Sequence, residues 1–137
     1  MLNESWRKLK SIDDTYESTG VLLFRNMFDI NPQSVNLFPF KGEENIYESK
    51  VLKKIGVQVM DCIEKSVKDI KSQLSVIEMT SRKHMPKDLD EHYFDIGGKA
   101  IIMTIEQVNK GMNDNTRKAW TKIYSIVKLS LKRSQLE

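Results

Sequence analysis

Apolar residues recur every three or four positions along most of the chain, and no stretch alternates apolar and polar residues as a half-buried strand would. The clearest run places Val51, Ile55, Val59, Ile63 and Val67 four residues apart, which is typical of one face of an amphipathic helix. Helices of this kind bury their apolar faces by packing against one another. The sequence therefore predicts an all-α fold.

The chain length predicts a single domain that spans residues 1–137, because a chain of this size buries about two thirds of its unfolded surface. Its single cysteine, Cys62, excludes an intramolecular disulfide and fits a reducing compartment. No apolar run approaches the ~20 residues that cross a bilayer, and the N-terminus lacks the pattern of a secretory signal. We therefore expect a cytoplasmic protein without a membrane span.

The charges argue against nucleic-acid binding. The 22 basic and 19 acidic residues are mixed along the chain and leave a net charge of +3, whereas nucleic-acid binding requires a concentrated basic stripe. Only Lys128, Lys132 and Arg133 hint at one, and a solvated helix face explains them better.

Cap and breaker residues divide the chain into about seven helices. Asn31 and Pro32 suit a helix start, Pro86 ends a helix near His84, and Gly111 ends the next helix. The expected helices span roughly 3–13, 18–29, 32–38, 51–67, a segment ending near 84, 91–110 and 116–133, with a loop at 41–47. The short helices cannot line a parallel bundle, so we expect steep crossings.

Several motifs occur in an order that is similar to the globin family. Pro32 and Phe38 lie six residues apart after an apolar helix that contains Phe24, and His84 precedes Pro86. Further matching stretches are Ser5–Arg7, Val21–Phe24, Arg82–His84, Tyr93–Phe94, Ala100–Ile102, Thr116–Trp120 and Tyr124. The pattern most resembles the neuroglobin branch and runs from Ser5 to about Val127. It implies the globin fold, with about seven helices around a haem pocket.

The resemblance implies that His84 is the metal ligand. Globin iron is held by a neutral proximal imidazole, and the chain has only two histidines, His84 and His92. His84 closes a helix before a loop, whereas His92 falls early in the next helix and is expected to be exposed. The alternative for His84 is a surface imidazole stabilised by the helix dipole. The implied cofactor is haem b.

The distal side departs from the family pattern. Ile55 lies 29 residues before His84, where most globins place a distal histidine, and Val59 follows one turn later. No histidine precedes His84, so the chain cannot form an internal two-histidine coordination. Gln58 is a candidate hydrogen-bond donor to a bound ligand, although a solvent-facing amide is an equal alternative. We expect Lys54 to face a propionate or solvent.

The resemblance thus implies a set of haem-contacting residues, most of them apolar. They are Phe24, Phe38, Phe40, Lys54, Ile55, Gln58, Val59, Lys83, His84, Phe94, Gly97 and Val127. Lys83 is expected near a propionate.

Two pairs of glycines draw attention because helix-interior glycine costs roughly 1 kcal/mol relative to alanine. Gly20 and Gly56 stand where globins bring their second and fifth helices into close contact, and we expect that contact here. Gly97 and Gly98 are adjacent in a predicted helix. Either they leave a cavity beside the porphyrin or they bend the helix.

The favoured function is reversible binding of a diatomic gas, such as oxygen, CO or NO, at a pentacoordinate iron, for storage, transport or sensing. One alternative is a redox enzyme such as a nitric oxide dioxygenase, which would need a separate electron-donor reductase. Another is a haem-free helical interaction module. The sequence favours gas binding over catalysis, in a monomer or a weak homo-oligomer.

Overall fold

Every regular element in the described residues, 2–68 and 91–136, is a helix in the computed structural model. The α-helices are α1 (Leu2–Ile12), α2 (Glu17–Ile30), α3 (Lys50–Lys68), α5 (Glu91–Val108) and α6 (Asp114–Leu136), and two 3₁₀ helices are η1 (Pro32–Leu37) and η2 (Ile46–Glu48). The all-α prediction is confirmed. The helix expected to end near His84 lies outside the described residues.

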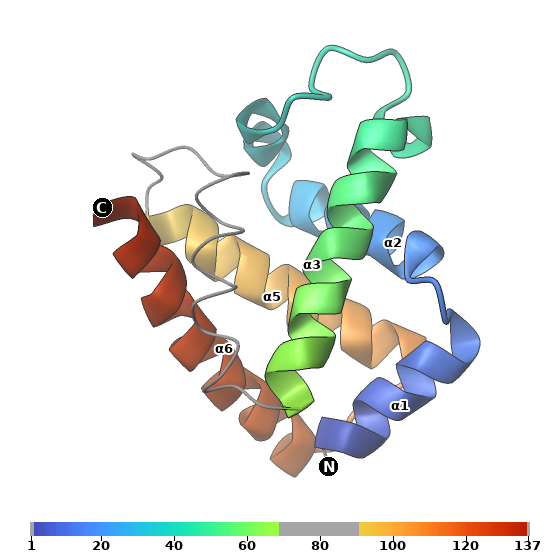
Figure 1. Ribbon diagram of the computed structural model, residues 1–137, viewed down its shortest axis with the longest axis vertical. Helices are drawn as coiled ribbons and strands as arrows, with labels where there is room; N and C mark the ends of the chain where they lie inside the picture. Colours follow the sequence, from blue (N-terminus) through green and yellow to red (C-terminus); the bar gives the residue numbers. More distant parts are fainter. Residues whose placement is uncertain (1, 69–90, 137) are drawn as a thin grey trace.

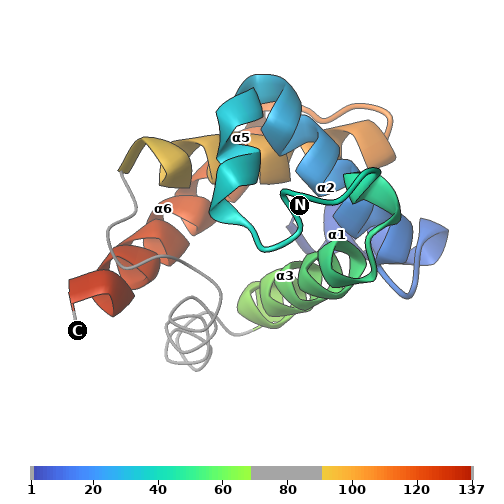
Figure 2. The same ribbon diagram turned by 90° about the horizontal axis from the view of Figure 1, so that it is seen from above.

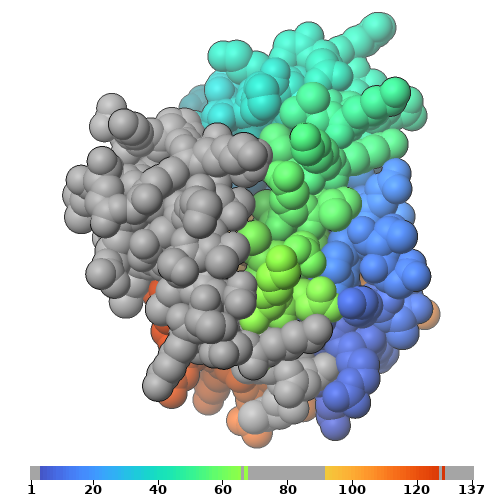
Figure 3. Space-filling view, viewed as in Figure 1, coloured from blue at the N-terminus to red at the C-terminus, as the bar shows by residue number. Residues whose placement is uncertain are grey.

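The helices cross at steep angles instead of lying side by side as a parallel bundle (Figure 1, Figure 2). Helix α2 packs against both α3 and α5, α5 packs against α6, and α1 touches α3, α5 and α6. The outer face of α3 lies on the surface beside α1 and α2 (Figure 3). Within the described residues, none of the helices is long and apolar enough to cross a membrane.

Two sequence boundaries are corrected in the segment between α2 and α3. The predicted helix at 32–38 is a 3₁₀ helix, and the predicted loop at 41–47 runs into a second 3₁₀ turn at Ile46–Glu48. Asn31 caps η1 as expected, since its side chain accepts a hydrogen bond from the Gln33 amide at 3.0 Å, and Pro32 follows in the first turn. Tighter i→i+3 turns suit such short pieces of helix.

The buried stripe of α3 differs from the four-residue run in the sequence. Val51 is 43% exposed, whereas Leu52, Ile55 and Met60 are buried. A helix has 3.6 residues per turn, so residues spaced four apart drift around its axis. The drift turns the first member of the run toward solvent and brings Leu52 inward.

The expected glycine contact between the second helix and the long helix is confirmed. A Cβ on Gly20 would lie 2.8 Å from the carbonyl carbon of Gly56, and a Cβ on Gly56 would lie 2.9 Å from the Cα of Gly20. Both distances are shorter than real Cβ contacts, and both neighbours are backbone atoms that cannot step aside. Helices α2 and α3 therefore approach as closely as they do because neither carries a side chain at this point.

Hydrogen bonds between polar side chains join α2 to α5. The Asn26 side-chain amide donates to Thr104 Oγ1 at 2.9 Å and to Gln107 Oε1 at 3.0 Å, both on α5. Asn26 and Thr104 are buried, and buried polar groups of this kind are costly unless they are paired. These hydrogen bonds fix the rotation of α2 about its own axis relative to α5.

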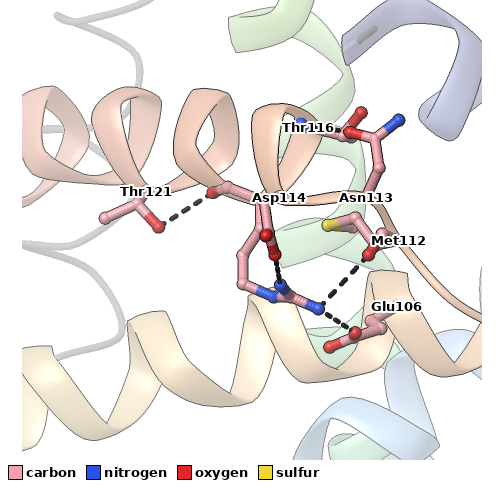
Figure 4. Close-up of polar contacts among 7 residues, drawn as sticks. Glu106, Met112, Asn113, Asp114, Thr116 and Thr121 are labelled. Carbon is pink, nitrogen blue, oxygen red and sulfur yellow. Dashed lines mark hydrogen bonds and ion pairs between the residues drawn. The ribbon is translucent and has the colours of Figure 1, made fainter.

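The corner between α5 and α6 is closed by caps and charges (Figure 4). Asn113 Oδ1 accepts the Thr116 amide at 2.8 Å, as expected for an N-cap. The Arg117 guanidinium donates to Asp114 at 2.9 Å, to the Met112 carbonyl at 3.3 Å and to Glu106 on α5. These contacts set the direction in which α6 leaves the corner.

We expect Gly56→Ala to lower the free energy of unfolding by about 1–3 kcal/mol, the range for overpacking a well-packed interface. The added Cβ meets the backbone of Gly20, so this clash outweighs the helix propensity of alanine. Urea unfolding followed by circular dichroism measures the change. Gly42→Ala is the matched control, because a Cβ at Gly42 meets nothing within 4 Å; equal effects of the two variants would contradict the close crossing.

Candidate functional site

Four phenylalanines from α2 and the segment after η1 form one aromatic cluster. Phe24 meets Phe38 and Phe40 edge-on, with ring centroids 5.1 and 5.5 Å away. Phe38 and Phe40 stack at 5.3 Å with their planes 8° apart. Phe28 joins from α2, with centroids 6.0 and 6.2 Å from these two rings. Edge-on and stacked pairs of this kind add stability beyond that of the buried area.

Helix α3 supplies the aliphatic wall of the same cluster. Ile55 and Leu52 are buried in it, and Val59 is half-buried against it. The position of Ile55 follows from the close crossing, because its neighbour Gly56 lies against Gly20. The predicted residues Phe24, Phe38, Phe40, Ile55 and Val59 are therefore brought together.

Gln58 and Lys54 lie on the edge of this wall. Together they line an open groove of about 410 Å³, whose other walls are Glu17, Lys50, Lys53 and Val57. Lys54 is exposed, which agrees with the solvent-facing alternative. Gln58 is half-buried, and its Oε1 is buried without a hydrogen-bond partner in the described part of the chain. An unpaired buried polar atom costs about 1–3 kcal/mol, so Gln58 Oε1 is open to a further hydrogen-bond donor.

Phe94 and the paired glycines lie where α5 meets α6. Phe94 is buried, and its carbonyl accepts a hydrogen bond from Tyr124 Oη at 2.5 Å. Helix α5 continues through Gly97 and Gly98. A Cβ on Gly98 would overlap the ring of Tyr124, whereas one on Gly97 would make ordinary contacts at 3.5 Å or more. Gly98 thus makes room for a tyrosine ring, a reason that the sequence did not suggest.

The Tyr124 phenol is a neutral hydrogen-bond donor under ordinary conditions. Burial raises the pKa of Tyr124 well above its usual value of 10.0, and the charge of Asp95 raises it further. The hydroxyl therefore keeps the proton that it donates to the Phe94 carbonyl. This bond connects the middle of α6 to the start of α5, beside the predicted haem contacts on α5.

We expect Gly98→Ala to destabilise the fold by about 1–3 kcal/mol, because the Tyr124 ring must shift and lose its bond to Phe94. Gly97→Ala is the matched control, and alanine there should be neutral or stabilising by up to about 1 kcal/mol. Thermal and urea unfolding of both variants provide the test. Equal destabilisation by the two alanines would show that the ring does not need the space at Gly98.

Three of the predicted site residues have side chains outside the described part of the structure. His84 and Lys83 lie outside the described residues, and so does the side chain of Val127, although its backbone belongs to α6. His92 is exposed, as expected. Among the described residues, no group of three or more His, Cys, Asp or Glu side chains could hold a metal ion.

Two residues that lie in or against the aromatic cluster were not predicted from the sequence. Leu52 is fully buried in the cluster, and a helical wheel that allows for drift would have found it. Tyr47 packs on the outer side of the cluster, 6.4 Å from Phe28, with the Arg25 guanidinium 4.2 Å from its ring centroid. Burial raises the pKa of Tyr47, and Arg25 opposes that shift. Only the fold brings Arg25 and Tyr47 together.

The crossing helices and the apolar cluster formed by α2, α3 and the segment after η1 indicate the chain's class. The sequence model of the globin family matches residues 21–130. The chain belongs to the globin family.

Within that family, the chain is similar to neuroglobin from Tetraodon nigroviridis, with 22% identity over 122 residues that cover 83% of this chain and 77% of that protein. Its fold is similar to that of a hexacoordinated haem protein from an anhydrobiotic tardigrade, with a TM-score of 0.81, 16% identity and coverage of 99% and 91% of the two chains. It is also similar to ferric Aplysia limacina myoglobin, with a TM-score of 0.77, 14% identity and coverage of 97% and 92%. At these identities the two structures support the fold alone.

The residues of this cluster fit a haem in their chemistry. A porphyrin is a flat, largely apolar macrocycle, and cofactor sites of this kind are lined mostly by apolar and aromatic side chains with a few polar groups. Phe24, Phe38, Ile55 and Val59 are the apolar members, and Gln58, with its unpaired Oε1, is a polar residue at the edge.

Proposed function

We propose that this globin binds haem b through His84 and uses the open position on the iron to bind a diatomic gas reversibly. Bound haem would supply an iron that coordinates the gas. In this proposal Phe24, Phe38, Ile55 and Val59 exclude water from the gas site, and Lys83 and Lys54 lie toward the propionates or solvent. Phe40, Phe94, Gly97 and Val127 complete the contacts with the porphyrin.

The observation that carries the proposal is the burial of Ile55 in the aromatic cluster. Ile55 is 7% exposed and packs with Phe24 and Phe40, so the residue next to the α2–α3 crossing presents hydrocarbon to this pocket. An isoleucine can neither ligate iron nor donate a hydrogen bond. This supports a pentacoordinate iron and a gas site with mostly apolar walls.

Coordination number separates this proposal from one of the structural neighbours. The tardigrade haem protein is described as hexacoordinated. A sixth protein ligand here would have to come from a residue other than histidine on the distal side, since no histidine precedes His84 in the sequence.

Gln58 is the proposed hydrogen-bond donor to the bound gas. The donor would be its side-chain Nε2 group, and its position one turn after Ile55 lets the side chain reach the edge of the apolar cluster. A hydrogen bond to a partly charged ligand oxygen contributes roughly 1.5–3 kcal/mol. Such a bond would favour oxygen over CO, which carries less charge on its outer atom.

We expect His84→Ala to abolish the five-coordinate ferrous haem spectrum, because the variant loses the proposed ligand. His92→Ala is the matched control and should keep the wild-type spectrum, since His92 is exposed. Absorbance spectra of the ferric, ferrous and CO-bound forms measure both haem occupancy and coordination. A six-coordinate ferrous wild-type spectrum without added ligand would contradict the open site. An unchanged spectrum of His84→Ala would exclude His84 as the iron ligand.

We expect Gln58→Leu to speed oxygen dissociation by roughly tenfold or more, the equivalent of about 1.4 kcal/mol or more of lost hydrogen bonding. Carbon monoxide dissociation should change much less. Stopped-flow or flash-photolysis kinetics provide both rates, and Lys54→Met is a control on the neighbouring, exposed side chain. Unchanged oxygen kinetics in Gln58→Leu would exclude the donor role.

We also propose that the protein is located in the cytoplasm and that it is a monomer or a weak homo-oligomer.

A further inference from the structure

Tyr16 holds a backbone conformation that bulky residues rarely adopt. It precedes α2 with φ of 63° and ψ of 11°, in the left-handed region. A non-glycine residue held there costs on the order of 1–3 kcal/mol, and it persists only where the surrounding contacts hold it. The contacts around Tyr16 therefore hold this strained backbone in place.

An aromatic chain surrounds the Tyr16 ring. The Trp6 Nε1–H donates to Tyr16 Oη at 2.9 Å, and the two ring centroids lie 5.6 Å apart. Trp120 lies next, with its ring centroid 5.8 Å from that of Trp6. All three side chains are at least 95% buried. Trp6 and Trp120 are the only two tryptophans in the chain.

A carboxylate lies beside the phenol in this cluster. Glu64 of α3 is 8% exposed. The Lys10 ammonium lies 2.5 Å from Glu64 Oε1 and 5.8 Å from the centroid of the Tyr16 ring, so the carboxylate is close to the phenol. Burial is the main cause that raises the pKa of Tyr16 to about 12; the hydrogen bond from Trp6 opposes this shift, and the Glu64 carboxylate adds to it. Tyr16 is therefore a protonated phenol in contact with a base.

We propose that Tyr16 is a proton-coupled electron donor to Trp6, with Glu64 as the proton acceptor. When a one-electron oxidant removes an electron from the indole of either tryptophan, the vacancy reaches Trp6. Tyr16 then gives one electron to the Trp6 radical cation and its phenolic proton to the Glu64 carboxylate. The products are neutral Trp6, the Tyr16 phenoxyl radical and protonated Glu64, so atoms and electrons balance.

The contacts set the direction of this transfer. At neutral pH a phenol is oxidised more easily than an indole, provided that a base takes its proton during the step. Glu64 is such a base, and the Trp6 N–H is already directed at the phenol oxygen, so the electron donor and the electron acceptor are in contact. The oxidising equivalent thus ends on Tyr16 and not on the tryptophans.

The experiment is pulse radiolysis of the full chain as purified, with azide radical as the one-electron oxidant, which attacks indole in preference to phenol. Because both tryptophans belong to the cluster, every indolyl radical starts there. In the wild type the indolyl absorption should decay in a first-order, concentration-independent process, with matching growth of the phenoxyl absorption. Tyr16→Phe should slow the decay by about tenfold or more, which corresponds to roughly 1.4 kcal/mol of activation free energy.

Matched variants separate the relay from general core damage. Tyr93→Phe removes a phenol that lies outside the cluster and should leave the decay unchanged. Trp6→Phe should uncouple Trp120 from Tyr16, whereas Trp120→Phe should preserve the transfer. Glu64→Gln should slow the transfer and reduce its solvent deuterium isotope effect while keeping a group of the same shape.

The result that overturns the proposal is an unchanged indolyl decay in folded Tyr16→Phe, as judged by its circular dichroism. If that variant does not fold, the wild type still decides the matter by freeze-quenched electron paramagnetic resonance of protein with ring-deuterated tyrosine. A spectrum that is unaffected by the deuterium would exclude a phenoxyl product, and a narrowed spectrum that persists in Glu64→Gln without any slowing would exclude Glu64 as the acceptor. Neither result depends on bound haem, so the outcome is separate from that of the gas-binding proposal.

Discussion

The rest of the structure depends on the contact between Gly20 and Gly56. Each glycine leaves no room for a Cβ on the other, so the distance between α2 and α3 is fixed by backbone atoms. The close crossing also sets the positions of residues near these glycines, because Ile55 directly precedes Gly56 and Phe24 lies one turn after Gly20. The aliphatic wall of the aromatic cluster is thus a consequence of how closely the two helices approach.

Much of this fold could be predicted from the sequence because the informative residues act locally. Asn31, Pro32 and Asn113 mark helix starts through their own hydrogen bonds or ring. The glycine contact could be predicted because the resemblance supplies its partner. The 3₁₀ form of η1 and the outward position of Val51 could not be, since both depend on small differences in helical twist.

The candidate site was predictable in part for a similar reason. Aromatic and aliphatic residues at family positions gather in one cluster, as Phe24, Phe38 and Ile55 do. The reason for Gly98 could not be found in the sequence, because the ring that fills its space comes from Tyr124 on another helix. Likewise, the phenol and the carboxylate near Trp6 come from the corner before α2 and from α3, so only the fold brings them together.

The Asn26 amide has a consequence for the opposite face of its helix. Rotating α2 by one residue would strand this amide in an apolar interface with α5, at a cost of about 1–3 kcal/mol. Asn26 therefore helps to fix which residues of α2 face the aromatic cluster, although its own hydrogen bonds are with α5. Asn26 lies two positions from Phe24, so its hydrogen bonds help to set the direction in which Phe24 faces, together with the packing around the ring.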